Sequence, residues 1–308
     1  MKKIVKVIRL RGIIVTVLSK SPEKAREIAG SIAKLEDKNK VEIYYRKLSP
    51  DLLLSVLVPT DYPDSILNAV STATLSDVII FRGDEPLNSF DGELLLLMST
   101  LEKKSMIIGG DERIKKLASS AGVKNALFVD SPHEIRFEDL AVDKDAGFIY
   151  IDRVFPVRGV GTVMLGYAKT SIRAHDKFVS LPAKKEIEIK SIQVLDVDFE
   201  EVGYGTRIGL AIKGEEYERL KETYSLVRDN MTEKIEGKIV KLPWTVDLKN
   251  GNEYHIYSEG CYSTGIVEVE GDSIRVQLRK PLPEAKEYLI ATPNTNGKMS
   301  RILGKITF

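Results

Sequence analysis

The feature of this sequence that most constrains its fold is a run of short apolar segments, interrupted by glycine, between residues 149 and 214. β-Branched and aromatic residues favour strands, and glycine among them marks bends and bulges. Residues 186–190 alternate charged and apolar side chains, which predicts a strand with one wet and one buried face. Several short strands with glycine between them favour a small antiparallel barrel. The middle of the chain is therefore predicted to be a β-barrel.

The first 145 residues have a different pattern, in which strand-like and helix-like runs alternate. Residues 11–18 are almost continuously apolar, as in a strand buried on both faces. Ser21, Pro22 and Glu23 then supply an N-cap, a proline at the first helical position and an acidic first turn, so a helix is predicted to about residue 35. Further strands are predicted at 41–45, 52–58, 78–81, 106–108 and 126–129, and helices at 64–74, 91–103 and 111–120. This alternation predicts an α/β domain with a mostly parallel, doubly wound, Rossmann-like sheet.

Short strand patterns return in the last part of the chain. Strands are predicted at 233–242, 253–258, 265–269, 273–278, 287–291 and 300–307, and together they predict a second barrel. The charged stretch 215–229 is expected to connect the two barrels, in part as a short helix. The predicted order is thus an α/β domain at 1–145 and antiparallel β-barrels at 146–230 and 231–308.

Three segments of the middle part resemble a known family when taken in order. They read Asp-Arg-Val-Phe at 152–155, Gly-Val-Gly-Thr-Val at 159–163 and Arg-Ile-Gly-Leu at 207–210. They resemble the second domain of the elongation factor Tu family of translation GTPases, and most of all SelB, the selenocysteine-specific elongation factor. The family's order of a GTPase domain and two barrels matches the predicted order along the whole chain. The resemblance implies a role in translation, with tRNA or the ribosome as the partner.

The three motifs with which this family binds GTP are missing or altered in the first domain. The first strand meets its helix through Ser-Lys-Ser-Pro at 19–22, without the glycines of a phosphate loop, and Pro22 removes an N–H donor. At the second motif Asp61 is kept but Asp64 replaces a glycine, which would bring negative charge towards a triphosphate. At the third motif Gly-Gly-Asp at 109–111 keeps the aspartate and lacks the asparagine and lysine. We therefore expect a pseudo-GTPase that binds neither GTP nor another cofactor.

Five side chains remain at the positions of the lost nucleotide site: Lys20, Ser21, Asp61, Asp64 and Asp111. An alternative for the first of these positions is that Lys20 and the start of the following helix bind an anion. No base or oxyanion site accompanies the carboxylates or serines at a recognisable spacing, so no catalytic residue is assigned.

The resemblance also implies a binding site in the middle domain. Asp152, Arg153 and Arg207 correspond to positions implicated in sensing the aminoacyl group in SelB-type factors. An aspartate beside two arginines can pair with an α-amino group and with an anionic selenol or the phosphates of a tRNA end. The alternative is that Asp152 and Arg153 form a solvated pair at the edge of the barrel.

Basic side chains of the last domain are candidates for RNA contact, although most such side chains on a strand are only solvated. Trp244 and Tyr262 are candidates for base stacking, but Trp244 is expected to lie in the core. The basic candidates are Arg275, Arg279, Lys280, Lys298 and Arg301.

Composition argues against several other classes of protein. Cys261 is the only cysteine and there are three histidines, which argues against disulfides, metal centres and a histidine-based triad. No apolar run approaches the roughly 20 residues of a membrane span, and no signal-peptide pattern is present. A cytoplasmic protein without a membrane partner is expected, and the net charge of +1, without a basic tail, argues against DNA. Abundant Lys and Glu with only two glutamines favour a thermophilic source.

The sequence leaves three functions open. The favoured one is a non-catalytic translation-factor paralogue that binds tRNA, the ribosome or another translation component. The first alternative is an active GTP-dependent elongation factor that delivers an aminoacyl-tRNA with an atypical pocket. The second alternative is a protein-interaction module built on the degenerate first domain.

Overall fold

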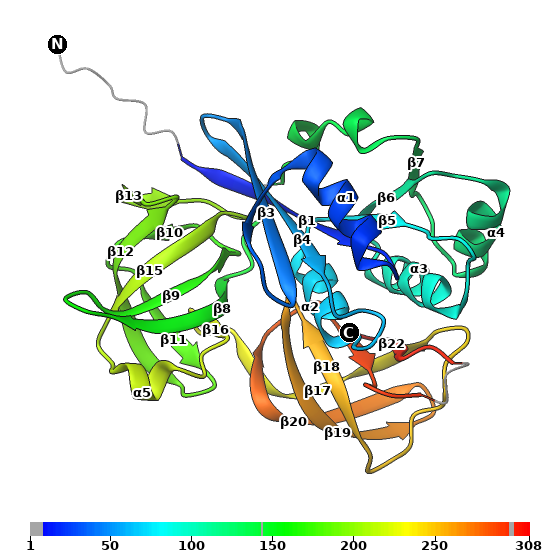
Figure 1. Cartoon of the computed structure of the whole chain (residues 1–308). Coiled ribbons are helices and arrows are strands. Elements are labelled where there is room, and N and C mark those ends of the chain that lie inside the picture. The colour runs from blue at the N-terminus through cyan, green and yellow to red at the C-terminus, as the bar shows by residue number, and fades with distance from the viewer. Residues whose placement is uncertain (1–8, 143, 296–298) are drawn as a thin grey trace. The chain divides into compact units, whose positions relative to one another are not determined.

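A computed structural model describes residues 9–142, 144–295 and 299–308, and Figure 1 traces the chain. The described residues group into two compact units. One unit contains the chain through Ile13 together with residues 47–54 and 137–229, and so includes the middle barrel. The other contains residues 14–46, 55–136 and 230–308, and so includes most of the α/β domain and the last barrel.

The α/β domain is built on one sheet with the strand order β2-β3-β4-β1-β5-β6-β7. The strands are β1 (Arg11–Leu18), β2 (Lys34–Asp37), β3 (Val41–Ser49), β4 (Leu52–Pro59), β5 (Val78–Arg82), β6 (Lys104–Ile108) and β7 (Leu127–Val129). The β1, β5, β6 and β7 strands pair in parallel, whereas β2 pairs antiparallel with β3. The predicted α/β fold is confirmed, although β2 was not predicted as a strand.

The helices of this domain are α1 (Pro22–Ile32), α2 (Leu67–Leu75), α3 (Ser89–Leu101) and α4 (Glu112–Ser120), followed by the short turns η1 (Pro132–Glu134) and η2 (Phe137–Leu140). The Ser21 hydroxyl caps α1 by accepting the N–H of Lys24, as the sequence predicts. The α1 helix ends before residue 35 because the chain turns into β2. Within the described residues, no helix is long and apolar enough to cross a membrane.

The middle barrel has the ring order β11-β16-β8-β9-β15-β12, which closes because β11 also pairs with β12. Its strands are β8 (Phe148–Val157), β9 (Gly161–Ala168), β11 (Lys177–Leu181), β12 (Lys185–Val194), β15 (Arg207–Lys213) and β16 (Ser225–Val227). The smaller elements are β10 (Ile172–Arg173), β13 (Val197–Phe199), β14 (Glu201–Val202) and α5 (Tyr217–Leu220). The stretch 215–229 is therefore more than the predicted connector, because its residues Leu226 and Val227 are fully buried in a strand of the ring.

The last barrel is closed and antiparallel, in the order β17-β20-β19-β18-β21-β22. Its strands are β17 (Met231–Lys241), β18 (Glu253–Ser258), β19 (Cys261–Glu270), β20 (Ser273–Pro283), β21 (Glu287–Ala291) and β22 (Ile302–Thr307). They confirm the predicted strands, with small shifts at the ends.

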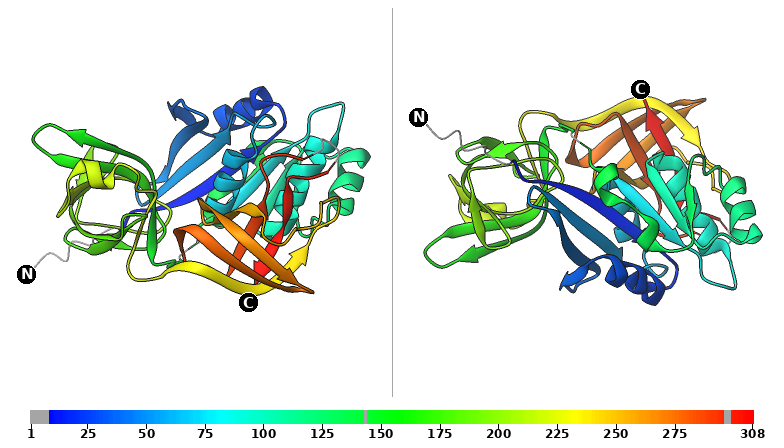
Figure 2. Two further views of the ribbon diagram at one scale, coloured as in Figure 1. Left: turned by 90° about the horizontal axis from the view of Figure 1, so that it is seen from below. Right: turned by 90° about the horizontal axis from the view of Figure 1, so that it is seen from above.

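The last barrel shares its hydrophobic core with the α/β domain. One cluster of buried side chains joins Phe81 and Leu94 of the α/β domain to Tyr257, Leu289 and Ile302 of the barrel. The α2 helix contacts β18 and β19, and α3 contacts β22. In Figure 2 the cyan helices lie beside the orange and red strands in both views. This shared core brings residues of α3 close to residues just before β22.

Candidate functional site

The connection from β1 to α1 holds a lysine that is bonded to the chain's own carboxylate. The Nζ atom of Lys20 lies 2.8 Å from Oδ2 of Asp91, a fully buried residue in the first turn of α3. Lys20 also donates to the carbonyl oxygen of Pro86. The same Asp91 oxygen accepts the N–H of Asn88 at 2.9 Å in the capping box of α3. Because a buried charge is tolerated when it is paired, this ion pair has a structural role inside the domain.

The N–H groups at the start of α1 are also engaged locally. The N–H of Ser21 donates to the hydroxyl of Ser19 at 3.3 Å, and the N–H of Lys24 donates to the hydroxyl of Ser21 at 3.3 Å. These are the groups that a phosphate at the N-terminus of a helix would use. Ser21 therefore acts as a helix cap in this structure.

The remaining aspartates of the predicted nucleotide positions have separate environments. Asp111 caps α4 by accepting the N–H groups of Arg113 and Ile114 at 3.0 and 2.9 Å. Asp64 is exposed. The Oδ2 atom of Asp61 accepts a hydrogen bond from Asn68 at 2.7 Å, whereas its Oδ1 atom is buried and has no hydrogen-bond partner among the described residues.

In the middle barrel the structure brings Asp152 and Arg207 together. The register of β8 against β9 shifts between Ile151 and Arg153, so Asp152 lies in a β-bulge. A bulge re-aims a side chain, and here Oδ2 of Asp152 lies 2.5 Å from a terminal guanidinium nitrogen of Arg207 on β15. Both side chains are partly buried, at 22% and 17% exposure. Asp152 is thus paired with Arg207 on a different strand.

The ring of Tyr167 completes this site. Tyr167 lies on β9, between the two strands that carry the ion pair, and the guanidinium carbon of Arg207 lies 5.2 Å from its ring centre. Burial lowers the pKa of Arg207, but Tyr167 and Asp152 raise it by more, so the pKa lies above its ordinary value. Arg153 is exposed on the same strand as Asp152. The site therefore offers a fixed cation and a carboxylate side by side at the barrel surface.

The RNA-contact candidates in the last barrel differ in their exposure and in their partners. Arg275 and Lys280 are exposed, and Arg279 forms an ion pair of 2.9 Å with Glu253. Lys298 lies outside the described residues. Tyr262 is exposed and its ring is parallel to that of His255, with the ring centres 5.7 Å apart.

Two predictions in this barrel are corrected by the structure. Trp244 is 42% exposed, so it is not a core residue. Arg301 is buried, so it is not the exposed RNA contact that the sequence predicts. Its position next to Glu93 explains the burial, because a buried arginine needs a carboxylate partner.

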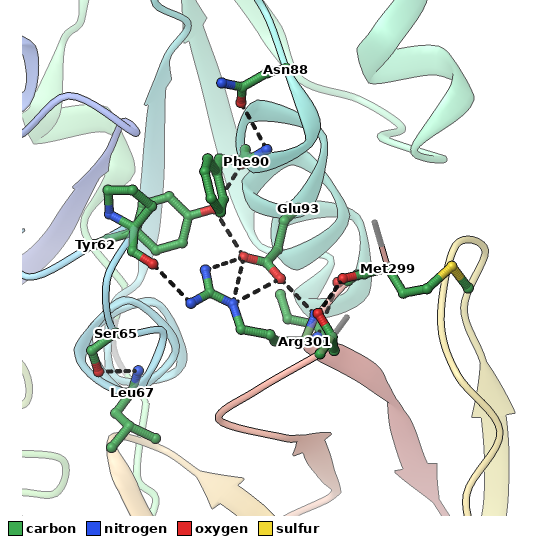
Figure 3. A network of polar contacts seen from close by, with 12 residues as sticks. Tyr62, Ser65, Leu67, Asn88, Phe90, Glu93, Met299 and Arg301 are labelled. Atoms are coloured by element: carbon green, nitrogen blue, oxygen red, sulfur yellow. Dashed lines mark hydrogen bonds and ion pairs between the residues drawn. The ribbon is translucent and has the colours of Figure 1, made fainter. Parts of the chain in front are cut away.

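Arg301 and Glu93 form a network that sequence reasoning missed, and Figure 3 shows it. A terminal guanidinium nitrogen of Arg301 donates to Oε2 of Glu93 at 2.6 Å, and the backbone N–H of Arg301 donates to Oε1 at 2.6 Å. The hydroxyl of Tyr62 donates to Oε2 of Glu93 at 3.0 Å. The sequence signal was a charged residue directly before four leucines in a buried helix, since such a residue needs a partner.

The architecture is similar to that of translation elongation factors. The structure superposes on SelB from Methanococcus maripaludis, solved with the GTP analogue GppNHp, with a TM-score of 0.74 and 16% identity over 97% of this chain and 79% of that one. The bacterial selenocysteine-specific elongation factor EF-Sec gives a TM-score of 0.72 with 16% identity over 97% of this chain and 58% of that one. At these identities the likeness establishes the fold.

The sequence is also similar to one uncharacterised protein and to elongation factors. An uncharacterised protein of Methanocaldococcus jannaschii is 28% identical over 256 residues, which are 77% of this chain and 82% of that protein. The selenocysteine-specific elongation factor of the same organism is 24% identical over 212 residues, 58% of this chain and 45% of the factor. Elongation factor 1-alpha of Picrophilus torridus is 26% identical over 106 residues, 34% of this chain and 25% of the factor. The matches thus span less than half of either factor, and no family model matches the chain.

Proposed function

We propose that this protein is a translation-factor paralogue that binds tRNA, the ribosome or another translation component without a cycle of GTP binding and hydrolysis. The fold and the relatives support the link to translation. The absence of a GTP cycle is inferred from the first domain. In a factor that cycles, nucleotide hydrolysis times release from the partner. A version without it holds or competes for the same partners.

The observation that carries this proposal is the ion pair of Lys20 with Asp91. A lysine in the loop after the first strand serves a phosphate only if its ammonium group is free to reach that phosphate. Here the ammonium group lies against a buried carboxylate and a carbonyl oxygen, so its charge is neutralised by the protein. A triphosphate would have to displace the Asp91 carboxylate from Lys20, and this nearby negative charge would repel the triphosphate.

The surface that we infer for RNA is the pair of Asp152 and Arg207. The end of an aminoacyl-tRNA carries an α-amino group and phosphates, which match a carboxylate and a guanidinium held side by side. The pair is only partly buried, so a ligand can exchange each internal contact for one of its own. The ring of Tyr167 keeps the guanidinium in place during this exchange.

The test of this function is binding of fluorescently labelled aminoacyl-tRNA and of ribosomes without nucleotide. We expect saturable binding that added GTP leaves unchanged, and about ten-fold weaker tRNA binding for Arg207→Ala, the size expected for a charge-assisted contact. Arg173→Ala is the matched control, because Arg173 is an exposed, ion-paired arginine on β10, outside the ring of the middle barrel but in the same compact unit. Equal losses for the two variants would contradict the assigned surface, and binding to neither tRNA nor ribosomes would contradict the function.

One observation favours the alternative of an active GTP-dependent factor. The buried Oδ1 atom of Asp61 has no hydrogen-bond partner among the described residues, and such an atom can be satisfied by a cation or a bound water. An active factor would bind guanine nucleotide only with magnesium. Magnesium-dependent binding that Asp61→Asn abolishes would support this alternative over the proposed function.

A further inference from the structure

The loop between β4 and α2, residues 60–66, is weakly capped where the helix begins. Ile66 occupies the N-cap position of α2 and supplies no side-chain hydrogen bond to the helix. The hydroxyl of Ser65 accepts the N–H of Leu67 at 3.3 Å, which is long for a hydrogen bond. A helix end without a good cap frays easily, because its first N–H groups lack partners. The conformation of this loop therefore depends on contacts from other parts of the chain.

Arg301, which directly precedes β22, makes such contacts. One terminal nitrogen of its guanidinium donates to the carbonyl oxygen of Pro63 at 2.8 Å, and the guanidinium carbon lies 5.3 Å from the ring centre of Tyr62. The Nε atom and the second terminal nitrogen donate to Oε2 of Glu93 at 3.2 and 2.6 Å. In Figure 3 the guanidinium lies between Glu93 and this loop. One side chain thus holds two consecutive loop residues against α3.

These contacts are buried and depend on the shape of the guanidinium. The side chains of Arg301 and Glu93 are 9% and 5% exposed, and Tyr62 is 1% exposed. A guanidinium has its donors in a fixed planar fork, so it can bond Glu93 and the carbonyl oxygen of Pro63 at the same time. A lysine ammonium group keeps the charge but lacks this fork. All of these residues belong to the same compact unit.

We propose that Arg301 is a latch by which the last barrel fixes the conformation of the β4–α2 loop. When the latch is closed, side chains of the protein itself hold the loop and the first turn of α2. When it is broken, this segment opens locally, while Val70 and Ala73 of α2 remain in the shared core. The loop carries Asp61 and Asp64, so the latch sets the position of these two carboxylates from the last barrel. This device does not depend on RNA binding.

Three variants separate the latch from a general effect on stability. Arg301→Ala removes every contact of the guanidinium, and Arg301→Lys keeps the charge without the fork. Lys305→Met is the matched control. Lys305 on β22 also connects the last barrel to the end of α3, through ion pairs of 3.1 Å with Glu102 and 3.2 Å with Glu287. The partners of Lys305 lie outside the β4–α2 loop.

The experiment is hydrogen–deuterium exchange of the full-length protein, measured on peptides that cover residues 60–70 and, as a reference, residues 104–108 of β6. The N–H groups of Ser65 and Val70 are bonded to carbonyl oxygens within the first of these segments, so they report its opening. We expect at least about ten-fold faster exchange at residues 60–70 for Arg301→Ala, because a buried ion pair is lost there, and a smaller increase for Arg301→Lys. Exchange in β6 should change much less, and Lys305→Met should leave residues 60–70 unchanged.

Three results would overturn the proposal. The first is unchanged exchange at residues 60–70 in Arg301→Ala when circular dichroism shows that this variant is folded. The second is an equal increase at β6, which would make Arg301 a general stabilising residue. The third is an equal effect of Lys305→Met on residues 60–70. If Arg301→Ala does not fold, Arg301→Lys is judged by the same three results.

Discussion

Two basic side chains that the sequence marks for ligand binding are bonded to carboxylates of the same chain. Lys20 lies against Asp91, and Arg301 lies against Glu93. In each pair the carboxylate comes from the first two turns of α3. The α3 helix thus neutralises both cations. The Lys20–Asp91 pair connects two segments of the α/β domain, and the Glu93–Arg301 pair connects this domain to the segment before β22.

The pair of Glu93 and Arg301 should contribute strongly to stability, because both side chains are buried. Glu93→Gln leaves the Arg301 guanidinium without its charged partner, and we expect a loss of about 3 kcal/mol in the free energy of unfolding. Urea unfolding of the full chain measures this loss. Arg279→Ala is the control, since its ion pair with Glu253 is exposed and should be worth less than about 1 kcal/mol. Similar small losses for both variants would contradict the buried network.

His255 should make stability depend on pH near neutrality. Burial lowers the pKa of His255 below its usual value of 6.5, and nearby Glu253 only partly offsets this effect. Because the folded-state pKa of His255 is lowered, folding favours the neutral imidazole. The stability that comes from burying this neutral ring is therefore fully present above pH 6.5, and it is lost as the pH falls through the folded-state pKa. We expect His255→Phe to lose less stability between about pH 7 and pH 5 than the unchanged protein. Urea unfolding at these two pH values tests this, and an equal loss for both proteins would count against it.

At the level of elements, Ser21 and Asp111 act as helix caps at positions where the sequence alone predicts remnants of a nucleotide site. Replacing either by alanine should cost about 1 kcal/mol of stability, the usual value for a lost N-cap. Thermal unfolding of Ser21→Ala and Asp111→Ala measures this loss. Asp64→Ala is the control, because Asp64 is exposed and should be neutral. An unchanged melting temperature for both cap variants would contradict a stabilising role for these two N-caps.

Most elements could be predicted because their apolar residues follow a clear period. The β1 strand is continuously apolar, and α1 has its cap and proline in sequence order. The β2 strand was missed because its residues Lys-Leu-Glu-Asp continue the polar pattern of a helix end. The β16 strand was missed because it is short and lies in a charged stretch. Both depend on pairing with distant strands, which no local pattern reveals.

The candidate sites were less predictable than the fold. The sequence marks Asp152 and Arg207, but not the bulge that directs one towards the other. It cannot reveal that Arg301 is buried, because Glu93 lies 208 positions away. Trp244 has an apolar sequence context, yet it is 42% exposed at a position with φ of +60°. Each of these facts arises from tertiary contacts.

For the whole molecule, the shared core joins the α/β domain to the last barrel in one unit, whereas the middle barrel belongs to the other. The Glu93–Arg301 pair adds a polar connection within the first of these units. Any movement of the α/β domain relative to the last barrel would have to break both the shared core and the buried Glu93–Arg301 ion pair.

The most direct measurement is magnesium-dependent binding of a fluorescent GTP analogue to the full-length protein, with GDP and ATP as controls. We predict no saturable binding at nucleotide concentrations up to about 1 mM, because the Lys20 ammonium group is held by Asp91. Saturable, magnesium-dependent binding at micromolar concentration, followed by hydrolysis, would contradict this and make the protein a working GTP-dependent factor.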